Sequence, residues 1–278
     1  MPGIWNLPKS PSGQHYEGLV IVDGTLIPHD FPTALSMGTV DVPLIYGNMQ
    51  CESDEGPEMD VSAYSMESWA VLLNTTFEGW AEPNVGAKIF DLYASAAEQN
   101  PQKAFDEIVS DYGLFCGQLA VARQALSPSS ESGGYQSSIY IYEDQWGLSQ
   151  SYTSPWTGTT VNYPFHDVFF FMVTGQWDLV GDMGTYEPSK EDLRAQKLLQ
   201  SILRFFMANQ SLEGSNLGWD PVNKDPNWAS SDNSLPYGNY SVFVIDPVDT
   251  RTVLNHKLDV CSYYHSIGLD QPQFWWAN

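Results

Sequence analysis

Residues 41–47 read DVPLIYG, a short apolar run that stops at a glycine. A run of this kind is typical of a strand that is buried on both faces of a parallel sheet. Two later runs have a similar character. SIYIY at 138–142 is rich in β-branched and aromatic residues, and SVFVI at 241–245 is followed by the turn-forming pair Asp246-Pro247. These runs predict three strands of one sheet.

Helical spacing separates the predicted strands. Between residues 110 and 126 the apolar residues recur at steps of four, three and four on one helix face: Phe115, Leu119, Ala122 and Leu126. A second helix is predicted from Ser189, which can form a capping box with Asp192, and a final helix over 253–267. Strands that alternate with helices indicate an α/β layer structure. No shift in composition divides the chain, so we expect one domain over residues 1–278.

The charge of the chain excludes several classes of partner. It has 34 Asp and Glu against 11 Lys and Arg, which gives a formal net charge of −23. Phosphate backbones and anionic lipid headgroups would repel such a chain, so we expect no nucleic-acid partner. No apolar stretch approaches the roughly 18 residues of a membrane-spanning helix. The first residues of the sequence show neither the charged nor the apolar region of a signal peptide.

Motifs for metal and phosphate chemistry are missing from the sequence. It contains no Gly-rich phosphate loop and no H-E-x-x-H helix, and its five histidines form no pair with ligand spacing, so we expect no metal or cofactor. The G-x-S-x-G turn that presents a nucleophilic serine is also missing, as is the glycine-rich loop that supplies oxyanion-binding amides. The sequence therefore shows neither a nucleophile turn nor an oxyanion loop of this kind.

His166 is the histidine whose position in the chain is most informative. It lies in NYPFHDVFFFMVTG at 162–175, at the end of a loop and directly before a very apolar turn. A histidine in this place can be held rigidly at the rim of a pocket. A packed or capping histidine is the alternative interpretation, because with 34 carboxylates some acid will lie near some histidine by chance.

Six segments resemble, in the same order, the C-terminal half of type-B carboxylesterases and cholinesterases, which are α/β-hydrolases. The segments are IVDGTLIP at 21–28, ALSMG at 34–38, VPLIYG at 42–47, the loop in which Gly175 follows His166 by nine residues, WDP at 219–221, and LDVCSYY at 258–264. The resemblance implies the C-terminal portion of an α/β-hydrolase fold, a mostly parallel sheet flanked by helices. The family's N-terminal half, with the serine and the oxyanion loop, has no counterpart here.

The resemblance also implies roles for two residues. In that family the catalytic acid follows the strand glycine by five residues, which from Gly47 gives Glu52. The family's Asp-Glu-Gly ending occurs three residues later, at 54–56, and would give Glu55 instead. We favour Glu52, because the strand end fixes where its side chain emerges, whereas Glu55 needs an insertion. His166 would be the general base of a Ser-Glu-His triad.

The function that the resemblance implies is hydrolysis of small carboxylic esters by a complete protein of which this chain is a part, inactive alone. The alternative is a non-catalytic, cholinesterase-like binding or adhesion protein, against which the retention of both Glu52 and His166 argues. The same resemblance pairs Cys116 with Cys261 in a disulfide and leaves Cys51 outside it. Three N-x-Ser/Thr sequons, at Asn74, Asn209 and Asn239, are candidate glycosylation sites and fit a secreted complete protein.

Overall fold

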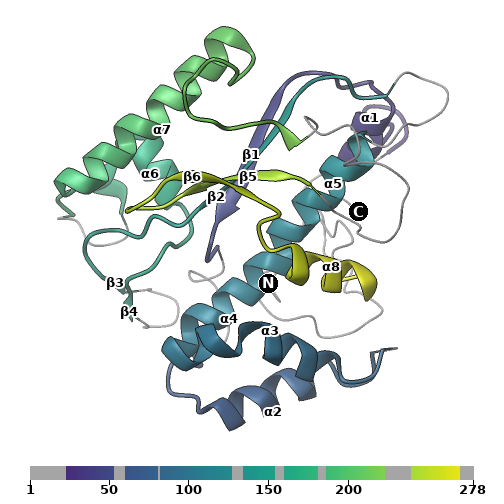
Figure 1. The fold of residues 1–278 in the computed structure, drawn as a ribbon, viewed down its shortest axis with the longest axis vertical. Helices are drawn as coiled ribbons and strands as arrows, with labels where there is room; N and C mark the ends of the chain where they lie inside the picture. The colour runs from purple at the N-terminus through teal and green to yellow at the C-terminus, as the bar shows by residue number, and fades with distance from the viewer. Residues whose placement is uncertain are drawn as a thin grey trace.

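A four-stranded sheet lies at the centre of the described part of the chain (Figure 1). The structure, a computed structural model, describes residues 23–52, 60–80, 82–126, 134–153, 160–180, 186–222 and 239–269. The sheet order is β1 (Leu44–Met49), β2 (Ile139–Asp144), β5 (Ser241–Ile245) and β6 (Arg251–Leu254). The first three strands run parallel, and β6 is antiparallel to β5. The three strands that the sequence predicted are therefore present and parallel.

Strand β1 differs from its prediction in one respect. Its first four residues are only half-buried, because β1 forms one edge of the sheet within the described residues. The glycine at its centre is needed for a steric reason. Gly47 is paired with Tyr142, and a Cβ added at Gly47 would lie 2.2 Å from the Tyr142 carbonyl oxygen.

Helices cover both faces of the sheet. Alternate residues of a strand point to opposite faces, so β2 contributes to two separate cores. Ile139 and Ile141 of β2 pack in a core with the helices α2 (Met66–Thr76), α3 (Val85–Gln99), α4 (Pro101–Ser110), α5 (Cys116–Leu126) and α8 (Leu258–Ser266). Tyr140 lies in a second core with α6 (Val168–Thr174) and α7 (Lys190–Asn209). Figure 1 shows α6 and α7 on one side of the sheet and α5 and α8 on the other.

The remaining elements are short. They are α1 (Phe31–Ser36), the π-helical turn η1 (Asp111–Phe115), the antiparallel pair β3 (Tyr152–Thr153) and β4 (Thr160–Val161), and the 3₁₀ turn η2 (Trp177–Leu179). Among the described residues, no helix is both long and apolar enough to cross a membrane.

The predicted helices are present with two corrections. The helix expected over 110–126 begins with the π-helical turn η1 and continues as α5 from Cys116. The final helix expected over 253–267 begins only at Leu258, after strand β6. Asn255 and Lys257 both have a φ of 55°, a left-handed conformation that a right-handed helix cannot contain. The capping box of Ser189 and Asp192 at the start of α7 is confirmed.

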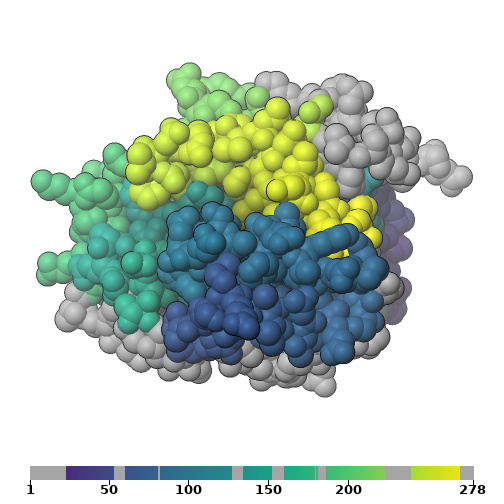
Figure 2. Space-filling view, turned by 60° about the horizontal axis from the view of Figure 1, so that its bottom comes forward, coloured from purple at the N-terminus to yellow at the C-terminus, as the bar shows by residue number. Residues whose placement is uncertain are grey.

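A disulfide between Cys116 and Cys261 joins α5 to α8, so the pairing that the resemblance implied is present in the structure. The two Cα atoms lie 5.1 Å apart. Helix α8 also contacts α3, where the Tyr264 hydroxyl donates to the Tyr93 hydroxyl at 3.2 Å. Figure 2 shows the yellow C-terminal segment lying directly against the blue atoms of α3. The last helix is thus fixed to the body of the fold by a covalent bond and by buried contacts.

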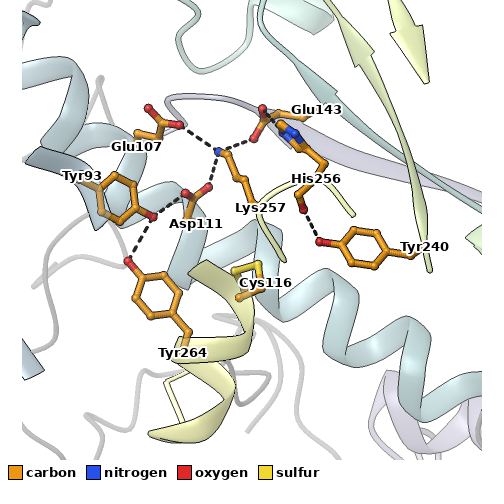
Figure 3. Close-up of a disulfide and its surroundings, with 10 residues drawn as sticks. Tyr93, Glu107, Asp111, Cys116, Glu143, Tyr240, His256, Lys257 and Tyr264 are labelled. Carbon is orange, nitrogen blue, oxygen red and sulfur yellow. Dashed lines mark hydrogen bonds and ion pairs between the residues drawn. A yellow bond between two sulfur atoms is a disulfide. The ribbon is translucent and has the colours of Figure 1, made fainter. Parts of the chain in front are cut away.

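A cluster of buried charges lies beside this disulfide (Figure 3). The Lys257 ammonium is 2.6 Å from a carboxylate oxygen of Asp111, 2.6 Å from Glu143 and 3.2 Å from Glu107. His256 lies 2.9 Å from the other oxygen of Glu143. Burial lowers the pKa of Lys257, but the three carboxylates outweigh it and hold that pKa well above its usual range. The cluster therefore ties α4, η1 and the end of β2 to the segment before α8.

Candidate active site

His166 and Glu52 meet at the carboxyl end of β1. Nδ1 of His166 lies 2.6 Å from Oε2 of Glu52, although the two residues are 114 positions apart in the sequence. A carboxylate can only accept a hydrogen bond, so Nδ1 is the donor and carries the proton in this pair. In a neutral imidazole this arrangement places the lone pair that can accept a proton on Nε2.

Glu52 is held by the chain around it. The acid turn, residues 49–52, begins at the last residue of β1, and the backbone N–H of Met49 donates to Oε1 of Glu52 at 2.7 Å. The backbone N–H of Glu52 itself donates to the Ser110 hydroxyl at 2.7 Å. Only 13% of the Glu52 side chain is exposed. Both ends of the residue are therefore fixed, and Oε2 is directed at the imidazole.

The histidine loop, residues 162–167, presents His166 at the surface. Phe165 before it is buried, and Asp167 after it takes a left-handed φ of 66° at the N-cap position of α6. The His166 side chain is 34% exposed, so a reactant can reach its ring. Nε2 lies 3.6 Å from Oδ1 of Asp167, which is itself 49% exposed. A surface contact of that length is weak, and we interpret Asp167 as a loop charge.

Asp144 is a second carboxyl group near Glu52, at the end of β2. It is fully buried, and Oδ1 accepts the backbone N–H of Trp146 at 2.8 Å. Within the described residues, Oδ2 has no hydrogen-bond partner. Burial raises the pKa of Asp144 to about 8, and the charges of Glu52 and Glu143 add to the rise against the lowering effect of the Trp146 amide. A neutral Asp144 adds no negative charge beside the His166 pair.

Asp144 makes the stability of the protein depend on pH. Its pKa is about 8 when folded and 3.8 in its ordinary state, so between these values the folded protein binds the extra proton. The free energy of unfolding therefore falls as the pH rises from about 4 to about 8, by up to about 1.4 kcal/mol per pH unit from this group. We expect Asp144→Asn, which mimics the neutral acid, to flatten this slope and to stabilise the protein at pH 8. Urea unfolding across this pH range measures it.

The control for this experiment is Asp60→Asn. Asp60 is exposed, and the hydroxyl and amide of Ser62 lower its pKa, so its titration lies below the pH range in question. The slope of the Asp60 variant should match that of the parent protein. An unchanged slope in the Asp144 variant would show that Asp144 is ionised in the folded protein.

The other residues singled out from the sequence are distributed as follows. Glu55, the alternative acid, lies outside the described residues. Cys51 is buried outside the disulfide, with its sulfur 3.8 Å from the Lys103 carbonyl oxygen. The side chains of the three candidate glycosylation residues, Asn74, Asn209 and Asn239, are all exposed. In the described ranges, no three His, Cys, Asp or Glu side chains are placed to hold a metal ion.

Sequence reasoning missed Ser110 and Lys257. Ser110 was predicted only as the start of a helix, and Lys257 as part of one. Their partners, Glu52 and Asp111, lie 58 and 146 positions away. No local spacing can relate residues so far apart. The signal available was weak: a lysine close to the C-terminus of a strongly acidic chain must find some carboxylates, but the sequence does not say which.

Comparison with known proteins identifies the fold. No protein-family model matches the chain, and no curated protein matches its sequence. Among solved structures, a para-nitrobenzyl (PNB) esterase is similar with a TM-score of 0.56 and 15% identity, over 87% of this chain and 42% of that one. A thermophilic PNB esterase is similar with a TM-score of 0.50 and 16% identity, over 85% and 41% of the two chains. The described chain therefore has part of an α/β-hydrolase fold of the carboxylesterase kind.

A juvenile hormone esterase from Manduca sexta with covalently attached OTFP is also similar, at 16% identity and a TM-score of 0.49, over 85% of this chain and 43% of that one. The chain thus spans less than half the length of each of these esterases. Identities this low describe the fold and leave the chemistry to the residues of this chain.

Proposed function

We propose that this chain supplies the acid and the general base of a serine carboxylesterase, whose attacking serine lies outside these 278 residues. The observation that carries the proposal is the 2.6 Å contact between Nδ1 of His166 and Oε2 of Glu52. A largely buried carboxylate on one nitrogen of an imidazole ring that is itself 34% exposed is the acid–base half of a catalytic triad. The carboxylesterase-like fold supports an ester as the substrate class.

The chemistry assigned to the pair is proton transfer. The serine oxygen attacks the ester carbonyl carbon while Nε2 of His166 takes the hydroxyl proton, and Glu52 stabilises the imidazolium at Nδ1. The imidazolium then gives its proton to the departing alcohol as the ester C–O bond breaks, which leaves an acylated serine. In the second half, His166 removes a proton from water, the resulting oxygen nucleophile releases the acid, and the proton returns to the serine.

The sequence supports placing the attacking serine outside this chain. None of the 278 residues forms a G-x-S-x-G turn, and the chain covers only 42% of the PNB esterase it resembles in fold. In the α/β-hydrolase fold the strained G-x-S-x-G turn presents the nucleophilic serine, and the oxyanion amides stabilise the charge that its attack creates. In the proposal, the same outside segment also supplies the residues that contact the acyl and alcohol groups of the substrate and complete the pocket.

A secretory route for the complete protein is part of the proposal. The chain has a disulfide between Cys116 and Cys261, and in most proteins a structural disulfide persists only in an oxidising compartment. The exposed side chains of Asn74, Asn209 and Asn239 leave all three sequons accessible to glycosylation.

Ester hydrolysis by the 278-residue chain alone tests this assignment. We expect p-nitrophenyl acetate to be hydrolysed no faster than by the same concentration of free imidazole, with no burst and no acetylated serine by mass spectrometry, because the nucleophile is missing. Saturable turnover that disappears in His166→Ala would contradict the proposal, since the chain would then contain its own nucleophile.

A further inference from the structure

The acid turn lies along one helix, α4. Each of the last three residues of the turn contacts a residue of this helix. Gln50 Nε2 donates to Glu107 Oε1 at 3.2 Å, Cys51 Sγ lies 3.8 Å from the Lys103 carbonyl oxygen, and the Glu52 N–H donates to Ser110 Oγ at 2.7 Å. The position of the Glu52 backbone is therefore set by α4 as well as by β1.

The histidine loop contacts the same helix. The Tyr163 hydroxyl, three residues before His166, donates to Oδ2 of Asp106 at 2.7 Å. Asp106 is fully buried and Tyr163 is 5% exposed, so this hydrogen bond is shielded from water. The other oxygen of Asp106 accepts from Nε2 of Gln102 at 3.1 Å. The carboxylate that receives the histidine loop is thus itself fixed within α4.

The two anchoring residues of α4 are joined to each other. Asp106 and Ser110 are one helical turn apart and lie on the same face. The Ser110 hydroxyl donates its proton to the Asp106 carbonyl oxygen at 2.7 Å, so a lone pair of Ser110 is left to accept from the Glu52 amide. The acid turn and the histidine loop are therefore hydrogen-bonded to two residues of α4 that are one helical turn apart and bonded to each other.

We propose that Tyr163 and Ser110 are positioning residues, which use α4 as a common platform to hold His166 and Glu52 in register. The catalytic part of this inference rests on the proposed function. The relative position of the His166 and Glu52 side chains does not, because it can be measured in this chain alone. Removing the Tyr163 hydroxyl frees the loop that carries the imidazole, and removing the Ser110 hydroxyl frees the acid turn. A displacement of about 1 Å in such a pair lowers turnover by up to about 100-fold.

The alternative is that the Tyr163 hydroxyl only satisfies a buried carboxylate. The chain contains a matched contact that separates the two ideas. The Tyr186 hydroxyl donates to Oδ2 of Asp192, also at 2.7 Å, and Tyr186 is 6% exposed while Asp192 is fully buried. None of the hydrogen bonds that the structure gives this second pair reaches the acid turn or the histidine loop.

Proton NMR of the 278-residue chain tests the proposal without any need for catalysis. A proton held between an imidazole nitrogen and a carboxylate is seen far downfield of the amide signals, and His166→Ala identifies which such signal belongs to His166 rather than to His256. We expect Tyr163→Phe and Ser110→Ala each to broaden or remove the His166 signal. The control Tyr186→Phe, with a comparable change in unfolding midpoint, should keep it.

The proposal is overturned if the signal survives unchanged in both Tyr163→Phe and Ser110→Ala, or if Tyr186→Phe removes it equally. Kinetics of the complete protein then test the catalytic meaning: Tyr163→Phe should lower kcat by about tenfold or more with KM changed less than twofold. If the NMR result is as expected but His166→Ala leaves turnover intact, the platform stands and the proposed function fails. The two failures are therefore distinguishable.

Discussion

Replacing Glu52 with glutamine will lower kcat of the complete protein by about 10⁴-fold in the hydrolysis of a p-nitrophenyl ester. The amide keeps the size of the side chain but has no charge to stabilise the imidazolium. It can also present its NH₂ group to Nδ1 of His166, which favours the tautomer in which Nδ1 has no proton. His166 would then offer a proton at Nε2, where the serine needs a base. KM should change little, because neither Glu52 nor its contacts are expected to bind the ester.

Two variants serve as controls for this result. Asp167→Asn removes a carboxylate that lies 3.6 Å from Nε2 of His166, and asparagine tolerates the left-handed φ of 66° at that position. We expect less than about a tenfold change, because a half-exposed charge is well screened. Glu55→Gln should behave likewise. Loss of turnover in the Glu55 variant, with Glu52→Gln active, would assign the role of acid to Glu55.

The second large effect concerns the disulfide. Replacing Cys116 and Cys261 by alanine should lower the free energy of unfolding by about 4–5 kcal/mol, because the bond joins residues that are 145 positions apart in the unfolded chain. We expect the damage to begin at α8. Lys257 directly precedes this helix, and within the described ranges its ammonium group is the only one placed among Asp111, Glu143 and Glu107. Urea unfolding of the double variant measures the loss.

Cys51→Ala is the matched control for the disulfide variant. Cys51 is as buried as the bonded cysteines, so its replacement removes a sulfur from the core without opening a cross-link. If the double variant loses no more stability than Cys51→Ala does, the cross-link contributes nothing beyond packing. Alkylation of both Cys116 and Cys261 in the unreduced, unfolded protein would show that the bond does not form.

The three parallel strands and the helices α5, α7 and α8 could be predicted from the sequence because their signals are local, whereas α2, α3, α4 and α6 were not predicted. The apolar run before Gly47 and the capping box at Ser189 each depend on residues within a few positions of one another. The predicted start of the final helix was wrong, because the spacing of apolar residues does not reveal backbone dihedral angles. Asn255 and Lys257 adopt left-handed conformations that end one element and begin the next. Strand β6 was missed for the same reason.

The candidate site was predictable only in part. The spacing from Gly47 indicated Glu52, and the apolar turn after His166 indicated the histidine, but both came through resemblance to a family. Neither Tyr163 nor Ser110 carried a local signal, because the residues that they bond are 57 and 58 positions away in the chain. Such contacts exist only once α4 has packed against the end of the sheet. The proposed platform is therefore a tertiary property, as is the raised pKa of Asp144.

Labelling by a fluorophosphonate probe tests the central assignment most directly, since the probe reacts only with a serine that a neighbouring base has activated. The complete protein, isolated at its natural length, should be labelled on one serine outside residues 1–278, and His166→Ala should reduce the labelling rate by at least about 10³-fold. The 278-residue chain alone should remain unlabelled. Labelling of a serine within this chain, or labelling of the complete protein at the same rate in His166→Ala, would contradict the assignment of His166 and Glu52 as the acid–base pair of an esterase.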